Sequence, residues 1–331
     1  MSACRPRRIS RSSSTHSSFR AATTASPSSE TIHMSEFQRA GFIGLGVMGE
    51  PICRNLAAKG GLPVLGCDTD PAPLQRLAPH GVAAATTTQI MRDCDVVFLS
   101  LPSGEIVAQL ARAADGLLAN TRAGQLIVDL STSPVDVTRE LAAEFAARGA
   151  TFIDGPVART RAAAEAGTLS VMIGGDAETF ARIKPLVSTF ANEITYCGPV
   201  GSGQVVKILN NMVLFETVVA LSEARAIARR SGVDPQVLLE TFTRGSADSF
   251  ALRNHGLKAI LPGEFPEKAF PVDYARKDLR YALALAEQTG VQALGARNVD
   301  HWFDAALAQG HGNRYFPVIS RVIDPDPGTT A

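Results

Sequence analysis

Short apolar runs alternate with helical patterns between residues 40 and 198. The runs are rich in Val, Ile, Leu and Phe, as the buried strands of a parallel sheet are. They cover residues 40–45, 64–68, 96–101, 126–130, 151–154 and 171–174. The segments between them, such as 135–148, repeat apolar residues every three or four positions, which predicts amphipathic helices. The alternation predicts a mostly parallel, doubly wound α/β sheet.

The pattern changes after a glycine-rich stretch at residues 198–203. Strand-like runs disappear, and residues 204–230 are typical of one helix, roughly 40 Å long. Further helical patterns follow at residues 235–242, 274–289 and 295–308. The long helix is apolar on more than one side, so we expect it to pack against the first domain and against another subunit. A monomer with a helical cap is the alternative.

Residues 1–35 precede this pattern and differ from it in composition. They are rich in Ser, Thr, Arg and Ala with little apolar periodicity, which predicts a disordered leader. An Arg- and Ser-rich, acid-poor leader is typical of an organelle transit peptide. The favoured alternative is an overextended start, because Met34 comes just before the first strand. We then expect translation from Met34 and a cytoplasmic protein.

Composition excludes several classes of protein. The 331 residues, 45% of them hydrophobic, can fill the cores of two domains. The chain beyond residue 33 carries 27 basic and 31 acidic residues without a basic stripe, so we expect no binding to nucleic acid. Its longest apolar runs are far shorter than the roughly 20 residues that span a bilayer, so we expect no membrane role. A small molecule is the expected partner.

The cysteines and histidines show no pattern of a metal or disulfide site. The five cysteines are odd in number and form no CxxC pair, which argues against a disulfide framework and structural zinc. The six histidines form no HxH or HExxH spacing. We therefore expect reduced thiols and no bound metal.

A glycine-rich turn between the first strand and the first helix indicates a dinucleotide site. The spacing of Gly44, Gly46 and Gly49 lets the backbone turn tightly, approach a pyrophosphate and open a helix whose amides face negative charge. Asp68 ends the next apolar run, where the adenosine ribose would lie. Its carboxylate would repel a 2′-phosphate, which favours NAD, with NADP as the alternative. The sequence therefore predicts a Rossmann domain at residues 36–200, followed by a helical substrate and dimerisation domain at residues 201–331.

Candidate acid–base chemistry lies near the start of the long helix. Lys207 and Asn211 are four residues apart and share a face, with Asn210 beside them. The neighbours of Lys207 are apolar, and burial among them would lower its pKa from about 10.4 toward the range of a proton donor. The alternative is a lysine whose long stem reaches water.

Four segments in order resemble the signature segments of the β-hydroxyacid dehydrogenase family. Residues 41–51 resemble its cofactor turn, and residues 154–161, with Ala164, Gly167 and Thr168, its substrate loop. Residues 198–211 resemble the start of its catalytic helix. Residues 277–279 resemble the segment whose lysine lies near cofactor and substrate. The resemblance spans about residues 40–305.

This resemblance implies an NAD-dependent oxidoreductase that interconverts a short β-hydroxy acid and its semialdehyde, as a homodimer or homotetramer. It makes Lys207 the general acid and base, and Asn211 the amide that orients the substrate. The implied cofactor contacts are Gly44, Gly46, Val47, Met48, Gly49, Asp68, Leu101, Thr132 and Lys277. The implied substrate contacts are Ser131, Arg159, Asn210 and Asn211.

The substrate loop departs from the family pattern. Most relatives read Pro-Val-Ser-Gly-Gly, whereas residues 156–161 read Pro-Val-Ala-Arg-Thr-Arg. A guanidinium offers a charged fork, so Arg159 is predicted to bind the anionic group of the substrate. The loop is similar to that of sulfolactaldehyde reductase, a member of the family that acts on a sulfonate. Residues 212–214, however, lack the hydroxyls that this reductase has after its Asn-Asn, which weakens the case for a sulfonate.

Two other functions remain open from the sequence. An imine reductase on the same scaffold is disfavoured by Lys207, which relatives acting on imines generally lack. A non-catalytic dinucleotide-binding scaffold is disfavoured by the set of Lys207, Asn211 and Lys277, because such a scaffold needs none of them.

Overall fold

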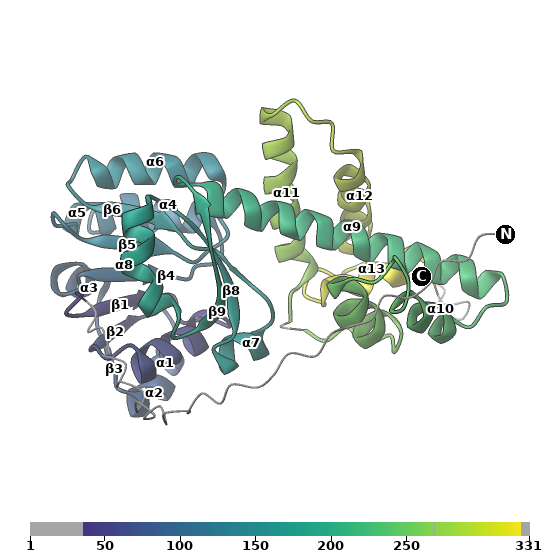
Figure 1. Ribbon diagram of the computed structural model, residues 1–331, viewed down its shortest axis with the longest axis horizontal. Coiled ribbons are helices and arrows are strands. Elements are labelled where there is room, and N and C mark those ends of the chain that lie inside the picture. The colour runs from purple at the N-terminus through teal and green to yellow at the C-terminus, as the bar shows by residue number, and fades with distance from the viewer. Residues whose placement is uncertain (1–35, 268, 326–331) are drawn as a thin grey trace, which may run out of the picture. The chain divides into compact units, whose positions relative to one another are not determined.

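The structure is a computed structural model that describes residues 36–267 and 269–325 (Figure 1). The predicted leader, including Met34, lies outside the described residues.

Within these ranges, nine strands form one sheet in the order β3-β2-β1-β4-β5-β6-β8-β7, with β9 paired to β8. Every pair from β3 across to β6 is parallel, as is β8 with β9, whereas β8 runs antiparallel to β6 and β7. The mostly parallel, doubly wound sheet is therefore confirmed. The strands are β1 Ala40–Ile43, β2 Val64–Cys67, β3 Val82–Ala84, β4 Val96–Leu99, β5 Leu126–Asp129, β6 Thr151–Asp154, β7 Val157–Ala158, β8 Leu169–Gly174 and β9 Ala191–Gly198.

Helices cover both faces of this sheet (Figure 1). Successive residues of each central strand point to opposite faces, so Phe42 and Phe98 join one apolar core while Ile43 and Val97 join the other. These helices are α1 Gly49–Lys59, α2 Pro71–Leu77, α3 Thr87–Asp93, α4 Gly104–Arg112, α5 Leu117–Asn120, α6 Val135–Ala146, α7 Arg161–Ala166 and α8 Ala177–Val187, with a 3-10 turn η1 Ala78–His80. The strand order reverses between β1 and β4, and ligands of such sheets bind at the carboxyl ends of the strands beside that point.

Three strands were not predicted, for identifiable reasons. β3 and β7 are too short to show periodicity, and β9 is rich in exposed polar residues. Two predicted strands, at 40–45 and 96–101, end two residues early, because the chain leaves the sheet to form the turns after β1 and β4.

The remaining chain is helical, as predicted. The long helix is α9 Ser202–Arg230, and its second half packs into an apolar core built around Phe215, Phe303 and Phe316. The other elements are α10 Pro235–Phe242, a π-helix η2 Leu252–Ile260, α11 Val272–Gln288, α12 Leu294–Ala308, a 3-10 turn η3 Phe316–Val318 and α13 Ile319–Ile323.

By length and composition, α9 is the one described helix that could cross a bilayer. The core helix of a globular protein meets the same criteria. α9 buries polar and charged side chains, including Gln204, Lys207 and Asn211, and packs against β8, α11, α12 and α13. Part of its apolar surface is therefore used in packing within this fold, while Val206, Leu209 and Val213 remain exposed.

Candidate active site

The turn after β1 has the backbone that a pyrophosphate requires. Gly44 has a φ of +92°, and a side chain there would also collide with the carbonyl of Ser100. Gly46 faces open space, so a ligand can approach its backbone closely. α1 then begins at Gly49 without a side-chain cap from Met48. Glu50 N donates to Gly46 O and Pro51 has no N–H, so an anion here would meet the amides that precede Glu50. The residues fit the predicted dinucleotide.

Asp68 follows β2 and fixes this turn. Its Oδ2 accepts a hydrogen bond from Leu45 N at 2.5 Å, and its Oδ1 accepts one from Asp70 N at 2.8 Å. The carboxylate is half-buried, and its Oδ1 also accepts from the Thr69 hydroxyl at 3.5 Å, so Oδ2 is the oxygen with a second lone pair for a ribose hydroxyl.

Lys207 projects from the second turn of α9 into a buried polar cluster. Its Nζ donates to Asn211 Oδ1 at 3.2 Å, while Asn211 Nδ2 donates to Asp278 Oδ2 at 2.7 Å. A lysine can only donate and a carboxylate can only accept, so these partners fix the orientation of the amide. Lys207, Asn211 and Asp278 are 8%, 2% and 3% exposed.

Burial lowers the pKa of Lys207 below its usual value, because the charged form loses solvation. The Asp278 carboxylate opposes this shift, and the charge of Lys277 adds to it. A lowered pKa moves a buried amine toward the range in which it serves as a general acid and base.

Lys277 approaches the same cluster from α11. Its Nζ lies 2.8 Å from Asp278 Oδ1 and 4.9 Å from the centre of the Tyr281 ring. The Tyr281 hydroxyl donates to Glu105 Oε2 on α4 at 2.8 Å, which joins the sheet domain to the helical domain beside Lys277.

The loop after β5 carries Ser131 and Thr132 and is hydrogen-bonded to Asp129, the last residue of that strand. This carboxylate accepts from Ser131 N at 2.9 Å and from Ser133 Oγ at 2.8 Å. Ser131 Oγ accepts from Leu101 N at 2.9 Å, so the loops after β4 and β5 are linked. Thr132 is half-buried between two buried serines.

The hydrogen-bond partners of Arg159 lie outside the cluster of Lys207, Asn211 and Asp278. It has a φ of +87°, a conformation that favours glycine, at the position where the relatives have one. Its Nη1 donates to Thr168 O at 2.6 Å and to Asn192 Oδ1 at 2.7 Å, and Nη2 lies 3.9 Å from Glu193. Among the described contacts, none joins Arg159 to Lys207, Asn211 or Lys277, so the structure does not place it in the lysine cluster.

The other predicted residues lie at the edges of these groups. Val47 is exposed on the glycine turn, and Met48 is half-buried. Asn210 is exposed on α9 and donates to Asn211 Oδ1 at 3.2 Å.

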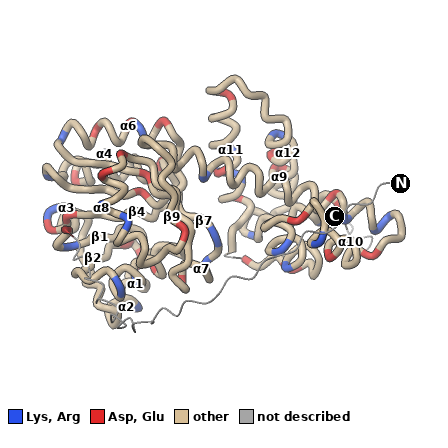
Figure 2. Tube along the Cα trace, viewed as in Figure 1, with Lys and Arg blue, Asp and Glu red and all other residues tan. Residues whose placement is uncertain are grey.

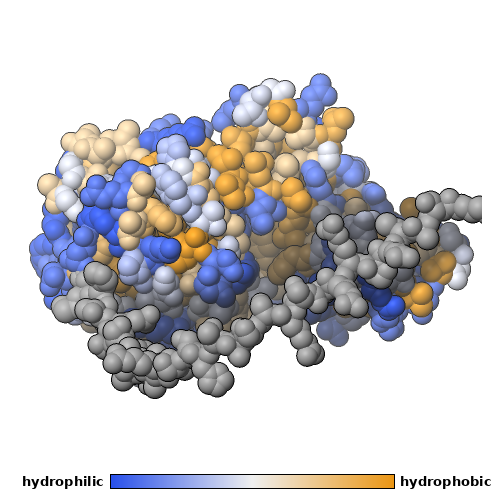
Figure 3. Space-filling model, viewed as in Figure 1, coloured by the Kyte–Doolittle hydropathy of each residue, from blue (hydrophilic) through white to orange (hydrophobic). Residues whose placement is uncertain are grey.

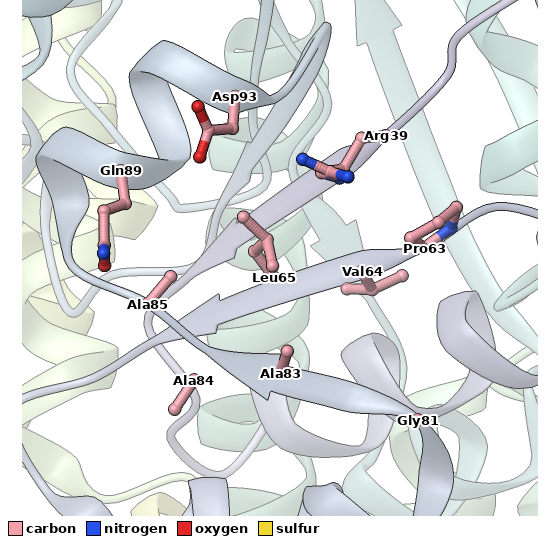
Figure 4. Close-up of a pocket in the computed structure, with 10 residues that line it drawn as sticks. All are labelled: Arg39, Pro63, Val64, Leu65, Gly81, Ala83, Ala84, Ala85, Gln89 and Asp93. Atoms are coloured by element: carbon pink, nitrogen blue, oxygen red, sulfur yellow. The ribbon is translucent and has the colours of Figure 1, made fainter.

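A shallow cavity of about 380 Å³ lies elsewhere, over β1–β3 and α3 (Figure 4). Its lining includes Arg39, Leu65, Gln89 and Asp93, but none of the predicted site residues.

In the described part of the chain, no group of three or more His, Cys, Asp and Glu residues could hold a metal ion.

The two parts of the chain match two family models. Residues 39–198 match the NAD binding domain of 6-phosphogluconate dehydrogenase, and residues 201–323 match the NAD-binding domain of NADP-dependent 3-hydroxyisobutyrate dehydrogenase.

Named relatives match over most of their length. The 2-(hydroxymethyl)glutarate dehydrogenase of Eubacterium barkeri is 31% identical over 88% of this chain and 97% of its own. The 3-hydroxyisobutyrate dehydrogenase of Pseudomonas aeruginosa is 37% identical over 76% of this chain and 86% of its own. The solved 3-hydroxyisobutyrate dehydrogenase of Mycobacterium tuberculosis with L-serine has a TM-score of 0.79 at 30% identity, over 87% of this chain and 99% of its own.

The chain belongs to the β-hydroxyacid dehydrogenase family. It is an NAD(P)-dependent dehydrogenase. The resemblance drawn from the four sequence segments is thereby confirmed, and the dehydrogenase interpretation is supported over an imine reductase. Solved imine reductases are less than 20% identical to this chain, so their likeness shows the fold alone.

Sequence reasoning missed four buried polar residues of this dehydrogenase: Asp129, Asp154, Gln204 and Asp278. A signal existed for the first two, because each ends an apolar strand with a carboxylate. The contact of Asp278 with Asn211 joins residues 67 positions apart and has no local signature.

Proposed function

We propose that the chain interconverts a short β-hydroxy acid and its semialdehyde with NAD(H), and that Lys207 is its general acid and base. The observation that carries this proposal is the buried Lys207 amine bonded to Asn211. The names of two relatives support the substrate class, since 2-(hydroxymethyl)glutarate and 3-hydroxyisobutyrate are both short hydroxy acids.

Each protein group then has a defined task. A dinucleotide held by the glycine turn would supply the hydride chemistry, as acceptor from the alcohol carbon or as donor to the carbonyl carbon. During oxidation the neutral Lys207 amine takes the hydroxyl proton, and the O–H electron pair becomes the second bond of the carbonyl. During reduction the Lys207 ammonium returns that proton. Asn211, fixed by Asp278, orients the reacting oxygen, and Lys277 contacts cofactor and substrate.

The loops around the site supply the remaining contacts. We assign Gly44, Gly46 and Gly49, with the backbone of Val47 and Met48, to the pyrophosphate. Asp68 takes the ribose and selects NAD over NADP. Leu101 and Thr132 line the cofactor, and Ser131 and Asn210 contact the substrate.

Arg159 is assigned to the acidic group of the substrate. Both of its described hydrogen bonds use Nη1, so Nε and Nη2 offer further donors to an anion while Nη1 holds the loop. A carboxylate fits the absence of hydroxyls at residues 212–214 better than a sulfonate does.

Arg159→Ala should raise substrate KM about tenfold or more, because a charge-assisted pair contributes roughly 1.5–3 kcal/mol, and should leave the Kd for NADH unchanged. Arg161→Ala is the matched comparison, since Arg161 lies two positions beyond Arg159 and pairs with Glu165 four positions further on; a rise in KM in that variant alone would make Arg161 the residue that binds the anion. If both variants keep the KM of the wild type for carboxylate and sulfonate substrates, Arg159 lies outside the site.

We further propose a cytoplasmic homodimer, with a homotetramer as the alternative, that binds neither nucleic acid nor membrane. Val206, Leu209 and Val213 form an exposed apolar stripe on α9, 42%, 38% and 56% exposed, that a second copy would cover. Figure 3 shows apolar surface where α9 and α11 lie. Basic and acidic residues alternate along the chain without a stripe of one sign, which argues against nucleic acid (Figure 2). The mass in solution, measured by light scattering, distinguishes the assemblies.

Turnover against a panel of substrates tests the proposal. NAD⁺ reduction should be seen with short β-hydroxy acids, and NADH oxidation with their semialdehydes. The panel also includes aldehyde sulfonates and cyclic imines. Turnover of imines alone would assign the chain to imine reduction, and NADH binding without any turnover would make it a scaffold.

A further inference from the structure

The side chain of Gln204 lies between α9 and the loop that follows β5. Its Nε2 donates to Ser131 O at 2.8 Å, and its Oε1 accepts from Ser133 N at 3.0 Å. Gln204 is fully buried. Its amide therefore binds the main chain on both sides of Thr132, the residue assigned to the nicotinamide side.

The backbone of Gln204 is fixed as well. The carboxylate of Asp154, at the end of β6, accepts from Gly201 N at 2.7 Å and from Gln204 N at 2.8 Å. Asp154 thus caps α9 from another element, since the helix has no side-chain cap of its own. The helix start also packs so closely that a side chain at Gly203 would collide with the carbonyl of Met172.

Lys207 lies three residues beyond Gln204 on the same helix, about one turn further along. A rigid helix start joined to a rigid loop sets the distance between the lysine and whatever the loop holds. Asp129 also bonds to Ser131 and Ser133, but from β5 within the sheet domain, whereas Gln204 bonds to the main chain on both sides of Thr132 from α9, the helix that carries Lys207.

We propose that Gln204 is a positioning residue that holds the Ser131–Ser133 loop in register with Lys207, so that the groups moving the hydride and the proton keep one geometry. This inference rests on the proposed function. Displacement of a positioned group by about 1 Å can cost on the order of 100-fold in rate, so the loss of this link should appear in catalysis as well as in stability.

Gln204→Met removes the amide and keeps much of the side-chain volume. The matched control is Gln125→Met. Gln125 is also fully buried, and its Nε2 donates to the carbonyls of Met91 and Cys94 at 2.8 and 2.9 Å. It precedes β5, at the opposite end of that strand from the loop.

Both variants should lower the melting temperature, because each removes two buried hydrogen bonds to main-chain groups, although the Cys94 carbonyl keeps its bond from Arg122 Nη2 in Gln125→Met. Only Gln204→Met should lower kcat, by about 10- to 100-fold, with the Kd for NADH close to that of the wild type. The deuterium isotope effect on kcat with NADH labelled at the transferred position should rise in this variant alone. Backbone amide exchange should accelerate at residues 131–133.

Equal losses of kcat in the two variants, or unchanged kcat and isotope effect in Gln204→Met, would overturn the proposal. These outcomes differ from a failure of the proposed function, in which the wild type itself turns over no substrate. In that case unchanged amide exchange at residues 131–133 in Gln204→Met would still overturn the claim that Gln204 fixes the loop.

Gln204→Glu serves if the methionine variant does not fold. When protonated, the new carboxyl can donate to Ser131 O and accept from Ser133 N, as the amide does; when ionised it cannot donate. Its kcat relative to the wild type should therefore rise severalfold between pH 9 and pH 6, and a flat ratio would contradict the proposal. The titratable groups around this position are Asp129 on β5, Asp154 on β6, Cys197 on β9, Lys207 on α9, and Lys277 and Asp278 on α11.

Discussion

Asp129 and Asp154 are paired in register at the ends of neighbouring strands, yet their hydrogen-bond partners differ in kind. Asp129 accepts from the Ser131 amide and from the Ser133 hydroxyl, and it also hydrogen-bonds with the Ser131 hydroxyl; hydroxyls can either donate or accept. Asp154 accepts from two backbone amides, which can only donate. Burial raises the pKa of each carboxyl to about 6, against the opposing effect of these hydrogen bonds.

Asparagine at the two positions should therefore behave differently. Asp129→Asn can keep both contacts by turning its NH₂ to the hydroxyl, and it removes a desolvated charge. Asp154→Asn must place its NH₂ against one amide, so we expect a loss of about 1–3 kcal/mol in the free energy of unfolding. Urea denaturation of both variants at pH 8 tests this contrast, and an equal loss in the two would refute it.

The raised pKa of Asp129 also sets a pH dependence. The native state binds the proton more tightly than the unfolded state, so this group's contribution to stability is complete below about pH 4 and is lost as the pH rises toward 6. Asp129→Asn should match the wild type near pH 4 and exceed it at pH 8. A variant less stable than the wild type at pH 8 would contradict this sign.

Asp68 is expected to decide between the two dinucleotides. Its carboxylate can accept from the ribose 2′-hydroxyl and repels a 2′-phosphate, so kcat/KM should be higher with NADH than with NADPH. Asp68→Asn should lower the ratio of kcat/KM for NADH to that for NADPH, because it weakens the binding of NADH. Steady-state kinetics with both cofactors check it, and a preference of the wild type for NADPH would reverse the assignment.

The sequence predicted residues whose chemistry has a local signature. The glycine turn and the Lys207–Asn211 pair could be predicted because their spacing along the chain alone sets their geometry. Gln204 and Asp278 were not predicted, because their partners lie about 70 positions away along the chain. The direction of the Arg159 side chain was equally out of reach, since it depends on the contact with β9 through Asn192.

At the scale of elements, α9 joins the two cores and is fixed at both ends. Asp154 holds its start, and Asp324, 1% exposed, pairs with Arg229 and Arg230 at its end. The Arg229 and Arg230 hydrogen bonds keep the pKa of Asp324 below its usual value despite burial.

Asp324→Ala should lower the free energy of unfolding by about 1–2 kcal/mol, because it removes the buried carboxylate that accepts from Arg229 and Arg230, while these partly exposed guanidiniums stay solvated. Substrate KM should not change, since Asp324 is bonded to the end of the helix far from Lys207 along its axis. Chemical denaturation and steady-state kinetics of the same preparation check both statements. A large change in KM with normal stability would show that this end of α9 acts on the site.

Helices and strands could be predicted where buried apolar residues recur at a regular spacing along the chain. Helix α10 was predicted to the residue, and the long helix α9 to within two. Strands β3, β7 and β9 were missed because short or edge strands take their stability from pairing with a neighbour, which the local pattern does not record.

At the scale of the whole molecule, the proposed site combines a sheet domain that carries the glycine turn with a helical domain that carries Lys207, the proposed proton donor. The two meet through α9, through the Asp154 and Gln204 contacts, and through the bond between Tyr281 and Glu105. The proposed mechanism therefore depends on one lysine, Lys207, at the start of the helix that joins the two domains.

The kcat of Lys207→Met tests that dependence most directly. Lys258→Met is its control, because Lys258 lies on the surface bonded to Asn254. With the best substrate of the panel, Lys207→Met should lower kcat by roughly 10²- to 10⁴-fold while NADH binding and melting temperature stay near the wild-type values. In the wild type, kcat for reduction should fall above an apparent pKa lower than the usual value of lysine, since the ammonium must donate. A Lys207→Met variant that keeps kcat within a factor of about three, with the same pH profile, would contradict the assignment of the proton to Lys207.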